Sequence, residues 1–206
     1  MLWHQYFALA ALFVCMASLT FHAIRFIRLG PPKDFSRQAG NTRSSIIYSF
    51  LGAMSPAKKE SAYLHLPTYT AGLFYHGGTF LSITVFFSLL SGVDYGGWIK
   101  WILITILAVS VISGSGILVK RITVKKIRSF SNLDDYLSNI LVTAFQVMTL
   151  LVLVSEVFLP IYFVTVSILL LYLPLGKLKH AFYFFAARYQ LGLFYGWRGI
   201  WPVRKP

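Results

Sequence analysis

Long apolar stretches separated by short polar connections set the pattern of this chain. Several of these stretches exceed the ~18 residues that indicate a membrane-spanning helix. The sequence therefore predicts an all-α fold, an integral membrane bundle of five transmembrane helices at about 3–27, 62–91, 98–120, 137–156 and 160–185.

The polar connections complete a single membrane domain over residues 1–206. The apolar piece at 46–54 is too short to cross a bilayer, so we expect it on the membrane surface or against a partner. Asp134 and Asp135 are placed to cap the helix that follows. Pro160 predicts a turn between the last two helices. Tyr, Trp and Arg in the tail 186–206 are typical of an interfacial segment.

Basic residues indicate the orientation. The chain has 19 Lys and Arg against 6 Asp and Glu, and only Lys100 of the basic residues falls on the predicted outer side. Positive residues mark cytoplasmic loops. We therefore expect the N-terminus outside and the C-terminus cytoplasmic, in a multi-pass protein of the inner (cytoplasmic) membrane. Because the loops account for the charge, no nucleic-acid partner is expected.

The scarcity of reactive motifs limits the function classes. Cys15 is the single cysteine, so a disulfide within the chain and covalent CxxCH haem attachment are excluded. No hydrolase elbow, phosphate loop or HExxH motif occurs. The spans hold few acidic residues and no repeat, which disfavours a transporter. No catalytic residue is predicted, and any redox chemistry would be shared with partner subunits.

Histidines are the candidate ligands. An ionisable side chain in a membrane helix is costly unless it has a partner or a role, and imidazole is a common axial ligand of haem iron. At ~1.5 Å per residue, His22, His76 and His180 lie about 25–30 Å from the outer end. His65 lies at ~42 Å, at or beyond the inner boundary. His4 is read as an interfacial residue, and so is His22 unless it is a ligand.

The segment "AGLFYHGGTF" puts His76 among Gly72, Gly77 and Gly78. Glycines let a flat macrocycle or a neighbouring helix approach the backbone closely. One interpretation is that they clear space for a haem held by His76. The other is that His76 forms a hydrogen bond between helices and the glycines serve helix packing.

The layout, with "LHLPTYTAGLFYHGGTF" and "KLKHAFYFFAARYQLGLFYGWRGIWP", resembles a family of membrane cytochrome b subunits. The family includes respiratory nitrate reductase gamma and the membrane subunits of heterodisulfide reductase and of sulfate-reducer redox complexes. The resemblance implies a five-helix haem b protein that exchanges electrons between quinone and an iron–sulfur partner.

Residue by residue, the resemblance matches His65 and His76 to the second-helix ligands and His180 to the inner fifth-helix ligand. It pairs His180 with His65, whereas the depth count favours His76 and His180. His65 and His22 are then alternatives or ligands of a second haem, because the outer fifth-helix ligand is missing. Four basic residues lie at the inner boundary: Arg25, Lys177, Lys179 and Arg188. They would bind the haem propionates or, on the other interpretation, only anchor the chain on the cytoplasmic side.

The sequence thus favours an electron-transfer subunit with one haem b, or two, working with quinone, menaquinone included. Its partners would be membrane lipid, a cytoplasmic iron–sulfur subunit and other membrane subunits. Tyr95, Trp98, Lys100 and Trp101 form an outer cluster that suits a quinone ring or, more simply, an aromatic belt. The alternative function is a haem-free membrane anchor of a redox complex.

Overall fold

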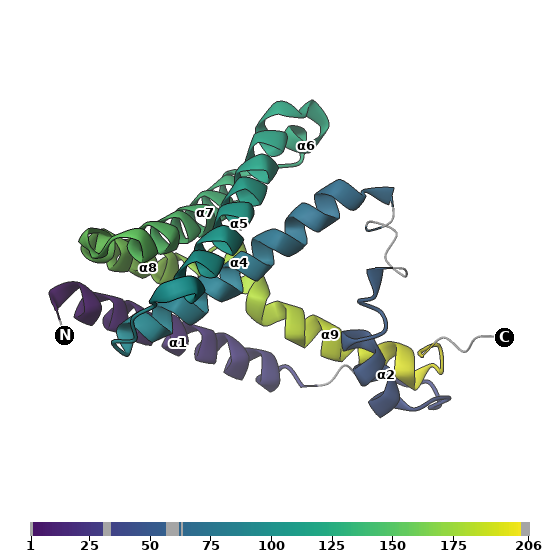
Figure 1. Cartoon of the computed structure of the whole chain (residues 1–206). Coiled ribbons are helices and arrows are strands. Elements are labelled where there is room, and N and C mark those ends of the chain that lie inside the picture. The colour runs from purple at the N-terminus through teal and green to yellow at the C-terminus, as the bar shows by residue number, and fades with distance from the viewer. Residues whose placement is uncertain (1, 31–33, 57–61, 63, 203–206) are drawn as a thin grey trace. The chain divides into compact units, whose positions relative to one another are not determined.

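The computed structural model describes residues 2–30, 34–56, 62 and 64–202, and it is helical without a strand in that part (Figure 1). The chain divides into two compact units, Met1–Ser18 with Pro67–Leu178 and Leu19–Leu66 with Lys179–Pro206. The longer helices are α1 (Trp3–Arg28), α2 (Thr42–Phe50), α4 (Leu66–Leu90), α5 (Gly97–Thr123), α7 (Leu133–Val154), α8 (Leu159–Tyr172) and α9 (His180–Trp197).

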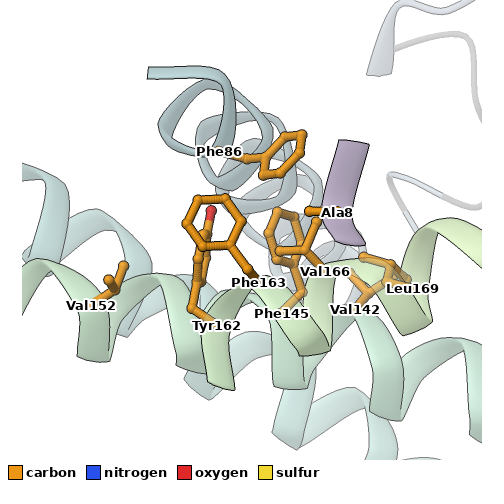
Figure 2. Packing of buried hydrophobic residues seen from close by; sticks show 9 residues of the cluster. All are labelled: Ala8, Phe86, Val142, Phe145, Val152, Tyr162, Phe163, Val166 and Leu169. Atoms are coloured by element: carbon orange, nitrogen blue, oxygen red, sulfur yellow. The ribbon is translucent and has the colours of Figure 1, made fainter. Parts of the chain in front are cut away.

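On α1, the helix that the first unit shares with the second, small residues turn inward and large apolar residues turn outward. On α1 the buried face repeats at Ala8, Ala11 and Cys15, while Phe13 is 75% exposed. Close packing of small residues with large apolar side chains turned outward is the arrangement of helices that meet in lipid. A cluster of rings and aliphatic side chains from α1, α4, α7 and α8 fills the centre (Figure 2).

These helices confirm the predicted all-α fold and fit a multi-pass membrane protein. Four of them, α1, α4, α5 and α7, are long and apolar enough to cross a bilayer, or five spans arise if α8 and α9 are counted as one interrupted span. The predicted bounds differ from the observed ones by a few residues. The orientation and the single membrane domain over 1–206 stay predictions.

The last predicted helix, 160–185, differs most from the structure. α8 ends at Tyr172, residues 173–176 form a turn, and α9 continues to Trp197, well into the tail expected to be interfacial. Pro174 and Gly176 account for the break, because proline lacks the N–H of a helix interior and glycine favours helix ends. The sequence prediction placed a hinge at Pro160 but overlooked this second break.

Asp135 organises one end of the first unit. It forms a capping box with Asn132, which begins α7, and so Asn132 rather than Asp134 is the N-cap. Its carboxylate also meets the Lys177 ammonium at 2.5 Å and the Arg121 guanidinium at 3.4 Å. One side chain thereby ties the start of α7 to α5 and to the short turn after α8.

In the second unit, α2 packs on α9 through two rows of small residues. Ser45 and Ser49 are fully buried on α2, and Gly192 and Gly196 are buried on α9. The Ser49 hydroxyl donates to the Arg188 carbonyl at 2.8 Å. Residues four apart lie on one helix face. The short apolar piece expected on the membrane surface or against a partner therefore packs on its own chain.

A clasp, formed by Asp34, Ser36, Trp197 and Arg198, holds the segment before α2 to the end of α9. Arg198 meets Asp34 at 2.8 Å, and the Trp197 indole donates to the Ser36 carbonyl at 2.8 Å. Hydrogen bonds from the Ser36 hydroxyl and amide, then Arg198, lower the pKa of Asp34. The carboxylate is therefore ionised at neutral pH and available to Arg198.

Candidate functional site

The carbonyl of Tyr75, one residue before His76, is the centre of a polar seam between α4, α5 and α7. It accepts hydrogen bonds from Gln146 Nε2 at 2.9 Å, Thr79 Oγ1 at 2.8 Å and Ser110 Oγ at 3.3 Å. Ser110 also donates to Gln146 Oε1 at 2.9 Å. Buried polar groups in an apolar interior are costly unless they are hydrogen-bonded. The seam therefore fixes how α4 is rotated in its unit.

This rotation turns His76 outward. The inner face of α4 is formed by Gly78, Ser82, Val85 and Phe86, and His76 is exposed on another face. Successive residues of a helix differ by about 100°, so a neighbour of Tyr75 cannot share its direction. The imidazole thus lies on the surface of the first unit, away from that unit's core.

The three glycines near His76 have different surroundings. A Cβ on Gly78 would overlap the Ser110 side chain, so this glycine serves the packing of α4 on α5. Nothing lies within 4 Å of a Cβ built on Gly72 or Gly77. Gly78 thus serves helix packing, and the other two glycines leave the surface beside His76 open, where a haem stays a prediction.

His22 has a partner for one ring nitrogen. Its Nδ1 lies 3.2 Å from the Tyr183 hydroxyl, which comes from α9 of the same unit. A metal-bound histidine usually has its second ring nitrogen hydrogen-bonded, which fixes the ring and the tautomer. With Nδ1 engaged, Nε2 is the nitrogen that can face a metal.

His180 and His65 also belong to the second unit. His180 is the first residue of α9, three residues before Tyr183, so the two side chains leave the same side of the helix. The structure thus brings His22 to the helix side that carries His180. His65 lies exposed in the bend before α4. Since His76 belongs to the other unit, its pairing with His180 or His22 stays a prediction, and so does the pairing of His65 with His180.

His4 points into its unit, and its position at the membrane interface stays a prediction. It is 3% exposed, and its ring stacks on Phe163 with centroids 5.4 Å apart. In the described residues neither ring nitrogen has a hydrogen-bond partner. The reason for its burial is the face that it shares with Ala8 and Ala11, which turns inward.

The four basic candidates for haem propionates are not equivalent. Lys177 binds the Asp135 carboxylate, which competes with any propionate. Arg188 is half-buried, with its guanidinium near Met54 Sδ and 5.6 Å from the centre of the Phe184 ring. Arg25, in the last turn of α1, is exposed, and Lys179 precedes α9. Arg25 and Lys179 therefore fit the role better.

Sequence reasoning missed two residues around these sites. Gln146 stands out as an amide inside a long apolar run, and this signal could have predicted the seam. Tyr183 gave no such signal, because aromatic residues are frequent along that part of the chain. Its contact with His22 joins α9 to α1, and the two residues are 161 positions apart along the chain.

The fold and these sites define the class of the protein only as a helical protein with membrane-spanning helices. Comparisons with protein-family models, curated proteins and solved structures find no match. In the described ranges no group of three or more His, Cys, Asp or Glu side chains could hold a metal ion.

Proposed function

We propose that this chain is a haem b-containing membrane subunit of a respiratory redox complex in the cytoplasmic membrane. It transfers electrons between the quinone pool and an iron–sulfur subunit on the cytoplasmic side. When bound, the haem supplies one-electron chemistry, because its iron alternates between ferric and ferrous states. Oxidation of a quinol to a quinone gives two electrons and releases two protons to water, so a one-electron carrier held by these histidines would take the electrons one at a time.

The observation that carries this proposal is the outward position of His76 between two glycines. The imidazole lies exposed on the surface of its unit. Gly72 and Gly77 have no side chains to cover the helix backbone beside His76, so a flat macrocycle can approach it. His180 is the first choice for the second axial ligand.

A second haem, or an alternative pairing, involves His22 and His65. The contact between His22 and Tyr183 favours His22, because it provides the hydrogen bond that commonly orients a ligating imidazole. Lys179 and Arg25 are the preferred partners for propionates, since guanidinium and ammonium groups bind carboxylates strongly.

The alternative function is a haem-free anchor subunit. Two observations favour it: Gly78 serves helix packing, and Lys177 is engaged by Asp135. A structural subunit needs close helix contacts and no ligating histidines.

A reduced-minus-oxidised visible spectrum of the purified full-length chain, alone and in its native complex, separates the two functions. A b-type band is expected, and its absence from both preparations leaves the anchor. His76→Ala and His180→Ala should each abolish a haem while insertion into the membrane is retained. His4→Phe is the control, because that imidazole lies inside its unit and should not affect the band.

The glycines allow a second arm of the same experiment. Gly77→Leu fills the open surface next to His76, so haem content should fall. Gly116→Leu is the matched control, since Gly116 on α5 also has nothing within 4 Å of a Cβ. Equal haem content in both variants would mean that the surface beside His76 does not receive the macrocycle.

A further inference from the structure

The second unit has positive charges that its own acids do not balance. Arg25, Arg28, Arg37 and Arg43 are exposed, and none has an ion pair or side-chain hydrogen bond with another described residue. The one acidic side chain among the described residues of this unit is Asp34, which binds Arg198 and Ser36. Among the described residues of this unit, no carboxylate neutralises these four guanidinium groups, and an external anion could bind them.

The positions of these arginines indicate the kind of anion. Arg25 and Arg28 occupy the last turn of α1, a helix long and apolar enough to cross a bilayer. The end of such a helix lies at the level of the lipid headgroups. Arg37 lies on the segment that the clasp holds to α9, and Arg43 lies on the first turn of α2.

Large apolar side chains are exposed on the same unit. Phe35 is 95% exposed, beside Arg37, and Leu51 at the end of α2 is 72% exposed. A surface that combines arginines with apolar side chains suits the boundary between headgroups and acyl chains, where one part contacts phosphate and the other hydrocarbon. Lipid satisfies both kinds of side chain, because its phosphate groups meet the arginines and its acyl chains cover the apolar residues.

We propose that Arg25, Arg28, Arg37 and Arg43 bind the phosphate groups of anionic phospholipids. A guanidinium group donates two parallel hydrogen bonds to a phosphate, which an ammonium group does not. Basic clusters next to a membrane helix attract anionic lipid. The lipid thereby holds the second unit at the membrane surface. For Arg28, Arg37 and Arg43 this role does not depend on haem, whereas Arg25 would bind a propionate where the proposed haem is present.

The test is a titration of the full-length chain in detergent with phosphatidylglycerol or phosphatidylcholine, with bound lipid counted by native mass spectrometry. The wild-type chain should prefer phosphatidylglycerol, and high salt should reduce the preference. R37Q/R43Q should weaken phosphatidylglycerol binding by roughly fivefold for each arginine. Neither residue belongs to the proposed haem site, so the haem band should be unchanged.

K125Q/K126Q is the matched control. Lys125 and Lys126 lie exposed on α6 (Lys125–Ser129) of the other unit, and their replacement removes the same charge. Phosphatidylglycerol binding should change much less than in R37Q/R43Q. Equal losses in the two variants, or no loss in R37Q/R43Q, would overturn the proposal. The arginines would then serve general charge or an acidic protein.

Discussion

His4 is a residue whose replacement should stabilise the protein. His4→Phe keeps the stack on Phe163 and removes two buried nitrogens without hydrogen-bond partners. An unsatisfied buried polar group costs about 1–3 kcal/mol, so thermal unfolding in detergent should shift upward by a few degrees. His4→Ala, which loses the stack as well, should shift it downward. A lower melting temperature for His4→Phe would mean that the imidazole has a polar partner.

Single residues were predictable from the sequence to different degrees. His76 was recognised because an imidazole between glycines is unusual in an apolar segment. The outward direction of His76 could not be predicted, because the rotation of α4 depends on three donors that converge on the Tyr75 carbonyl from α4, α5 and α7. The burial of His4 could not be predicted, because it depends on small residues of its own helix that face the core.

At the scale of elements, length and hydropathy predicted the helices well and their packing poorly. α5 and α7 begin and end within a few residues of the expected bounds, because long apolar runs are a strong signal. The break between α8 and α9 was missed although Pro174 and Gly176 mark it. The packing of α2 on α9 had only a weak signal, the four-residue spacing of small residues on both helices.

The contact between α2 and α9 gives a prediction at this scale. A Cβ on Gly196 would lie 2.6 Å from Ser45 Cβ and 2.8 Å from Thr42 Cα, so Gly196→Ala forces the helices apart. Overpacking costs about 1–3 kcal/mol. Hydrogen exchange of the α2 amides should therefore accelerate. Gly116→Ala, which meets nothing within 4 Å, should leave exchange unchanged. Unaltered α2 exchange in Gly196→Ala would contradict this packing.

At the scale of the whole molecule, the candidate site residues were predictable but their pairing was not. A count of ~1.5 Å per residue gives the depth of each imidazole, but it says nothing of helix rotation or of which helices are neighbours. The resemblance and the depth count accordingly favoured different partners for His180. Neither the resemblance nor the depth count could predict the contact between Tyr183 and His22, which shows that α1 and α9 are neighbours.

The orientation of the chain in the membrane is the prediction that belongs to the molecule as a whole. Only Lys100 of the 19 Lys and Arg residues lies on the predicted outer side. Asp94, between α4 and α5, and Ser129, at the end of α6, are both exposed. Asp94→Cys in intact cells should react with a membrane-impermeant maleimide, and Ser129→Cys should react only after permeabilisation.

The chain supplies its own control for this labelling. Cys15 is 2% exposed, so the unaltered protein should give almost no signal. The expected pattern follows from the excess of positive residues that cytoplasmic loops retain during insertion. The opposite pattern would put Arg121, Lys125 and Lys126 outside. An iron–sulfur partner docked on the cytoplasmic side would then meet the end of the molecule with few basic residues, and that part of the proposed function would fail.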